Sequence, residues 1–151
     1  MEQLFNDMQK QIALKLGDEI TMADEDYGQL EALMNGGDQY PVTFPCVLIG
    51  TPQVEWRTLN QDVQLGACTL TVRLAFDCYD DTRYGSGQEQ AAAARMALSR
   101  KLNACIHGWK FDGCARVMIR RTSRQYSLPG GIKVYEQSYD TDVEDRLTET
   151  C

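Results

Sequence analysis

The chain has 151 residues and a formal net charge of −7, with 43% hydrophobic and 25% charged residues. This length suits one compact domain with a sizeable core, and the balance of residue types argues against wholesale disorder. The excess of acidic residues repels phosphate, which argues against general nucleic-acid binding.

The sequence also excludes several classes of site and location. It has no run of about 18 apolar residues, so we predict no membrane-spanning helix. The N-terminus is acidic and lacks the features of a signal peptide, so we expect the six cysteines to be reduced, buried thiols. None of them forms a C-x-x-C pair and His107 is the only histidine, so we predict no metal site and no cofactor.

The first predicted element is an amphipathic helix over residues 1–16, which Gly17 ends. A short helical stretch is expected next, with Asp24-Glu25-Asp26 as its solvated start and Asn35-Gly36-Gly37 as its end. Apolar residues recur at helical spacing in the first helix, with mostly polar residues between them: Phe5, Met8, Ile12 and Leu16.

Strand patterns follow in the middle of the chain. Short strands are expected over 44–49 and 54–59, and a turn over 60–62. The clearest strand is 67–79, where apolar and polar residues alternate over its whole length. Its even-numbered residues are expected to face the core: Cys68, Leu70, Val72, Leu74, Phe76 and Cys78.

A polar loop over 80–87 leads to a second long helix, expected from 88 to 107. Ser86 and Glu89 have the spacing of a capping box, and Gly108 stands where a C-terminal glycine belongs. The apolar stripe of this helix is expected to lie on the sheet: Ala91, Ala94, Leu98, Leu102, Cys105 and Ile106.

The last elements form a β-hairpin of strands 114–126 and 132–139, joined by a turn at 129–131. The sequence therefore predicts a single α+β domain over 1–143, followed by an acidic, flexible tail over 144–151. Its fold would be an antiparallel sheet of about four strands, with a long helix packed on one face and the N-terminal helix beside it.

The arginines of strand 114–126 suggest a binding surface. By parity Arg116, Arg120 and Arg124 share one face, and Arg121 points the other way. They either dock an acidic partner or pair across strands with acids of a solvated sheet face. Aromatic and arginine side chains are typical interface anchors. The candidate interface residues are therefore Arg116, Arg120, Arg124, Tyr126, Tyr135, Tyr139, Asp140 and Asp142, with Glu136 as a further pairing candidate.

No catalytic motif is found, so we predict no catalytic residues. His107 fits the end of a helix, where the dipole favours an imidazole, and its pairing with Cys105 or Cys114 as a nucleophile is the less favoured alternative. Asp77, Asp80 and Asp81 fit a solubilising loop better than a carboxylate site. A phosphate at the helix start near Ser86, with Arg83 beside it, is disfavoured because no other cation is close.

Three segments stand in a distinctive order between the N-terminal helix and the end of the hairpin: FPCVLI over 44–49, LTVRLAFDCY over 70–79 and IKVYEQSYDT over 132–141. In this layout, which covers residues 1–143, the chain resembles the tail-terminator and tail-completion proteins of long-tailed bacteriophages and prophages.

The resemblance implies a structural protein that caps the tail tube as a ring, commonly a hexamer. Such a ring ends tail polymerisation and provides the surface that joins the head. The implied partners are further copies of the chain, the tail-tube protein and the head–tail connector protein, with DNA only as passing cargo and no membrane. The implied location is the host cytoplasm during assembly and then the virion tail.

Two alternatives remain open. One is a neighbouring neck or head-completion protein, which would share the size and acidity of this chain. The other is a small cytoplasmic adaptor or binding module, and self-association separates it from the ring.

Overall fold

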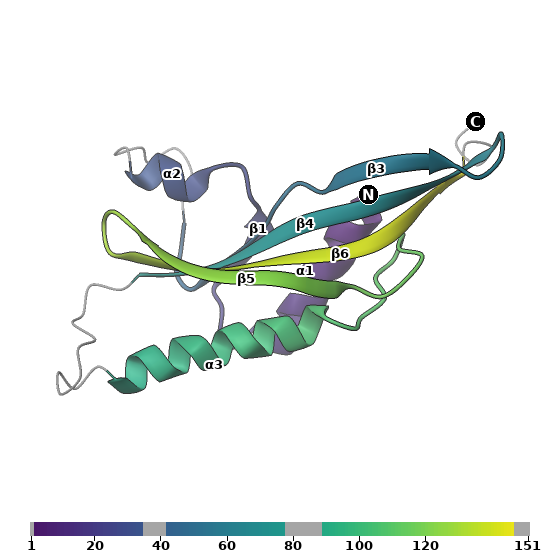
Figure 1. The fold of residues 1–151 in the computed structure, drawn as a ribbon. Helices are drawn as coiled ribbons and strands as arrows, with labels where there is room; N and C mark the ends of the chain where they lie inside the picture. The colour runs from purple at the N-terminus through teal and green to yellow at the C-terminus, as the bar shows by residue number, and fades with distance from the viewer. Residues whose placement is uncertain (1, 35–41, 78–88, 147–151) are drawn as a thin grey trace.

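The computed structural model describes residues 2–34, 42–77 and 89–146. Figure 1 shows the elements in chain order, from the N-terminal helix to the long last strand. They are α1 (Glu2–Leu16), β1 (Met22–Glu25), α2 (Gln29–Met34), β2 (Cys46–Ile49), β3 (Gln53–Thr58), β4 (Val63–Asp77), α3 (Glu89–Ile106), β5 (Ile119–Leu128) and β6 (Ile132–Arg146). None of the helices in these ranges is long and apolar enough to cross a membrane.

The fold is α+β, with a mixed six-stranded sheet and three helices. The strand order is β1-β2-β4-β6-β5, and β3 pairs with the part of β4 that β2 leaves free. The expected antiparallel sheet of about four strands is only roughly correct. β1 pairs parallel to β2, from Met22 opposite Cys46 to Glu25 opposite Ile49, and the other pairings are antiparallel.

One face of the sheet, called here the inner face, is covered by α1 and α3. The even-numbered residues of β4 from Cys68 to Phe76 point to it, as their alternation predicts. Leu4, rather than Phe5, joins Met8, Ile12 and Leu16 in the buried stripe of α1. On α3 the buried stripe begins at Leu98, because Ala91 is half-buried and Ala94 is exposed.

The opposite face, called here the outer face, is covered in part by α2 (Figure 1). It carries the odd-numbered residues of β4 and the even-numbered residues of β6. A second buried apolar cluster lies there, so β4 is buried on both faces near its end. The cluster consists of Leu30, Cys46, Leu48, Ala75, Ile132 and Val134.

Several turns are as the sequence predicts. Gly108, two residues after the end of α3, has a φ of 80°, and Gly130 and Gly131 have φ values of 91° and 79° between β5 and β6. Asn60 Oδ1 accepts hydrogen bonds from the backbone N–H of Asp62 at 2.8 Å and of Val63 at 3.1 Å. These contacts fix the β3–β4 hairpin.

Three predicted boundaries are wrong. Asp24 and Glu25 belong to β1 rather than to a helix start. The strand expected from Cys114 begins only at Ile119, because residues 114–118 form an irregular segment whose only bridge joins Cys114 to Val143. β6 pairs with β4 as far as Arg146, so a domain end at 143 is three residues too early.

Other predictions concern residues outside the described ranges. They are Asn35-Gly36-Gly37, Cys78, the loop 80–87 with Asp80, Asp81, Arg83 and Ser86, and the last part of the acidic tail, residues 147–151.

Candidate functional site

A β-bulge in β5 separates the arginines that parity places together. β5 and β6 shift register between Arg120 and Thr122, so Arg121 is an extra residue in the ladder. Arg120 lies opposite Tyr139, whereas Arg124 lies opposite Glu136. Since directly paired residues share a face, Arg120 belongs to the inner face and Arg124 to the outer face. The prediction that Arg116, Arg120 and Arg124 share one face is therefore wrong.

The other arginines pair with acids along the outer face of β6. Arg116 Nε lies 2.8 Å from Asp142 Oδ2, and Arg121 Nε lies 2.8 Å from Asp140 Oδ2. Arg124 forms a third ion pair, with Glu136, and this hydrogen bond raises the pKa of the guanidinium. These are the cross-strand pairs that one reading of the sequence expected. They compensate the positive charge of the outer face within the subunit.

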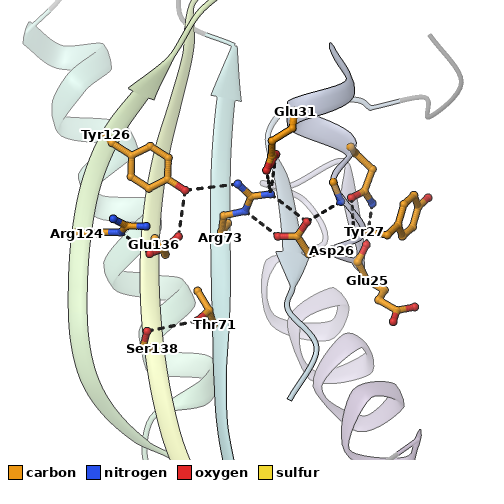
Figure 2. A network of polar contacts seen from close by, with 12 residues as sticks. Glu25, Asp26, Tyr27, Glu31, Thr71, Arg73, Arg124, Tyr126, Glu136 and Ser138 are labelled. Atoms are coloured by element: carbon orange, nitrogen blue, oxygen red, sulfur yellow. Dashed lines mark hydrogen bonds and ion pairs between the residues drawn. The ribbon is translucent and has the colours of Figure 1, made fainter. Parts of the chain in front are cut away.

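Arg73 forms the centre of a polar network on the outer face (Figure 2). It is only 8% exposed, and its Nε and Nη2 bind the two oxygens of Asp26 at 2.7 and 3.0 Å. Nη2 also lies 2.9 Å from Glu31 Oε1 on α2. Nη1 lies 3.5 Å from the Tyr126 hydroxyl, which donates to Glu136 Oε1 at 3.0 Å.

This network links α2 and the end of β1 to strands β4, β5 and β6. Burial alone would lower the pKa of Arg73, but its hydrogen bonds to Asp26 and Tyr126 outweigh burial and raise it. Arg73 therefore stays charged and holds the carboxylates around it. This role of Arg73 is not predicted from the sequence. The available signal was a single arginine in an otherwise apolar part of the 67–79 pattern.

The three candidate tyrosines divide between the two faces. Tyr126 lies on the outer face, with the Arg124 guanidinium 4.9 Å from its ring centroid. Tyr135 is 4% exposed, and its ring meets Phe76 edge to face. Tyr139 is fully buried, and its hydroxyl donates to Asn103 Oδ1 at 3.0 Å. Tyr139 is a core residue beneath α3, so the prediction of a surface anchor is wrong for it. Tyr135 is also nearly buried, but it lines a groove between α3 and the hairpin of β5 and β6.

A groove of about 510 Å³ lies between α3 and the hairpin of β5 and β6, and the outer-face pair of Arg124 and Glu136 also lines it. Arg120 reaches along it and donates from Nη1 to Gln137 Oε1 at 3.0 Å. Arg100 of α3 lines the same groove, and no ion pair or hydrogen bond of its side chain is found within the described part of the chain. Met96 adds an apolar side chain that is 45% exposed. This groove was not expected from the sequence.

Four residues in the described ranges were candidates for catalysis or metal binding: His107, Cys105, Cys114 and Asp77. His107 Nδ1 accepts the backbone N–H of Arg120 at 3.0 Å, which joins the end of α3 to β5. Cys105 and Cys114 are buried, and burial raises the pKa of both thiols, which disfavours a thiolate nucleophile. Asp77 is exposed at the end of β4. Within the described ranges, no group of three metal-binding side chains comes together.

Comparison with known proteins gives a likeness of fold. No protein-family model matches the chain, and no curated protein matches it in sequence. A chain of a solved structure described as the virion of a native gene transfer agent particle has a similar fold, with a TM-score of 0.58 and 12% sequence identity. The match covers 95% of this chain and 96% of that chain. The likeness therefore extends over the whole fold rather than over one motif.

Proposed function

We propose that the chain is a structural protein of a phage-like virion and that it caps the tail tube as a ring. The observation that carries this proposal is the likeness to a chain of a gene transfer agent virion over nearly the full length of both. A match of this extent favours a protein of the same overall shape and size as that virion chain.

The proposed mechanism is steric. A ring of identical subunits ends the growth of the tail tube on one side and offers a new surface to the head connector on the other. Each subunit of a cyclic ring uses two different surface patches, one for each neighbour. The net charge of −7 suits a ring through which DNA passes, because like charges repel. The proposed partners are further copies of the chain, the tail-tube protein and the head–tail connector protein, and the proposed role includes no catalytic step.

The fold likeness also fits a neck or head-completion protein, because such proteins belong to the same virion. The two roles differ in what happens to tails when the protein is missing. A terminator limits tail length, whereas a neck protein acts only after the tail is complete.

Electron microscopy of particles made without this protein tests the proposal. The gene is deleted from the phage-like genetic element that carries it, and a plasmid that supplies the gene serves as the control. We expect filled heads without tails, together with tails of abnormal length, and normal particles when the plasmid is present. Tails of normal length beside tailless heads would assign the neck role. Normal particles would refute a virion role and favour an adaptor.

A further inference from the structure

Acidic and basic residues are separated along the chain. Residues 16–56 contain eight acidic residues and no lysine or arginine, whereas residues 113–135 contain five basic residues and no acidic one. The first segment includes β1 and the second includes β5. These two strands lie at opposite ends of the strand order β1-β2-β4-β6-β5. The fold therefore places the acidic strand β1 and the basic strand β5 at opposite edges of the sheet.

Part of the acidic charge stays uncompensated within the subunit. Asp26 and Glu31 are held by Arg73, and Glu19 pairs with Lys101. In Figure 2 the side chain of Glu25 points away from the network around Arg73. Four carboxylates of this segment form no ion pair within the described ranges: Asp18, Asp24, Glu25 and Glu55. Two of them lie on the edge strand β1 and are called here the acidic edge: Asp24 and Glu25.

Uncompensated positive charge gathers at the other end of the sheet, in the groove between α3 and β5. Acids of β6 pair with three of the outer-face arginines. Within the described ranges, the side chain of Arg120 has only the neutral Gln137 as a partner. Arg100 adds a second cation to the groove, and Met96 an exposed apolar surface. β5 is also at one end of the strand order, so the backbone groups along its free edge are open to pairing with another strand.

We propose that this groove binds the acidic edge of a second copy of the chain. The inference rests on the proposed function, because it assigns the two patches through which neighbouring subunits of the ring meet. Each copy carries one groove and one acidic edge at opposite ends of its sheet, so the contact is head to tail and can close into a ring. Exposed ion pairs contribute at most about 1 kcal/mol each, so they fix the orientation while Met96 and the β5 edge add contact area.

Charge reversal tests this assignment on the full chain. One variant carries Arg100→Glu and Arg120→Glu, a second carries Asp24→Lys and Glu25→Lys, and a third carries all four changes. Sedimentation velocity over a range of concentrations measures self-association. We expect each of the first two variants to have an association constant about ten-fold lower than that of the unmodified chain, which corresponds to about 1.4 kcal/mol. The combined variant should recover it, because the charges are again complementary.

A matched control changes the net charge of the chain as the groove variant does, with Lys10→Glu and Arg57→Glu. Both residues are exposed and lie outside the groove and the acidic edge. We expect this control to associate as the unmodified chain does, and circular dichroism checks that every variant folds. Unchanged association of the groove variant, failure of the combined variant to recover, or an unmodified chain that stays monomeric would each overturn the assignment. The virion role is judged separately, by the particles formed without the protein.

Discussion

Arg73 connects three parts of the chain that are distant in sequence. Its guanidinium contacts Asp26 after β1, Glu31 on α2 and Tyr126 on β5. We expect Arg73→Met to lower the free energy of unfolding by about 3 kcal/mol, because removing one partner of a buried ion pair leaves the other charge uncompensated. Urea denaturation followed by far-UV circular dichroism measures the change.

Arg57→Met is the matched control for this prediction. Arg57 is exposed on β3 and forms no ion pair within the described ranges, so its loss should change stability by no more than about 0.5 kcal/mol. If the two variants were equally stable, the network would contribute no net stability. In that case apolar burial, including that of the fully buried Leu30, would hold α2 on the sheet.

The buried thiols make stability depend on alkaline pH. Burial raises the pKa of Cys46 from 9.0 to about 12 and that of Cys68 from 9.0 to about 11. Above pH 9 the unfolded chain therefore loses these protons while the folded chain keeps them. Stability should fall on the order of 1.4 kcal/mol per pH unit for each thiol, between about pH 9 and pH 12 for Cys46 and between about pH 9 and pH 11 for Cys68.

Cys46→Val tests this dependence, because valine is apolar, similar in size and does not ionise. We expect a shallower fall of the unfolding free energy above pH 9 in the variant, whereas at pH 7 the two proteins should differ only through packing. Denaturant titrations at several pH values measure the slope. An identical slope in both proteins would mean that Cys46 does not cause the alkaline loss.

At the scale of elements, the β3–β4 hairpin depends on a residue without a side chain. A Cβ atom on Gly66 would lie 2.3 Å from Val54 Cγ1 and 2.9 Å from Trp56 Cε3. Gly66→Ala must therefore displace one of these side chains, at a cost of about 1–3 kcal/mol. The denaturation midpoint measures the loss, and tryptophan fluorescence reports movement of Trp56.

A second substitution separates this steric cause from a general effect of alanine. Val54→Ala removes the nearer of the two clashing atoms, so in the Gly66→Ala background it should recover part of the lost stability. In the unmodified chain the same Val54→Ala change should only destabilise. Additive losses in the double variant would contradict the steric explanation.

The elements that the sequence predicts well are those whose own residues repeat a clear pattern. Strand 67–79 alternates because one face lies on the inner core, and the helix expected over 88–107 has both an apolar stripe and Gly108 at its end. β1 was missed because it has only four residues, two of them acidic, and is a strand through its pairing with β2. A strand that forms only through pairing with a distant segment need not have a repeating pattern of apolar residues in its own sequence.

The candidate site was only partly predictable for a similar reason. The acids Glu136, Asp140 and Asp142 were correctly identified as pairing candidates for the arginines. The bulge at Arg121 was not visible, and one extra residue moves every following side chain to the other face. The groove also requires Arg100 from α3, which only the packing of helix against sheet brings beside Arg120.

At the scale of the whole molecule, β4 and β6 contribute to apolar clusters on both faces of the sheet. α1 and α3 close the inner cluster, while the shorter α2 closes the outer one. The ends of the sheet are left to β1 and to β5, which differ in charge. This arrangement favours contacts between subunits at the ends of the sheet over contacts through its faces.

Salt should affect the proposed assembly in two opposing ways. The net charge of −7 makes whole subunits repel each other, whereas the groove and the acidic edge attract at short range. The Debye length is about 10 Å at 0.1 M salt and about 3 Å at 1 M. Long-range repulsion is therefore largely screened at 0.1 M already, and further salt acts mainly on the close pairs. We expect self-association to be strongest near 0.1 M and to weaken toward 1 M.

Light scattering coupled to size exclusion at several salt concentrations measures this dependence. The variant with Arg100→Glu and Arg120→Glu should lose the weakening above 0.1 M, because its groove no longer attracts the acidic edge. In this variant the groove repels the acidic edge, and salt screens that repulsion, so association should instead rise steadily with salt. Association of the unmodified chain that grows up to 1 M would mean that apolar contact rather than charge drives assembly, since concentrated salt screens ion pairs but does not weaken apolar burial.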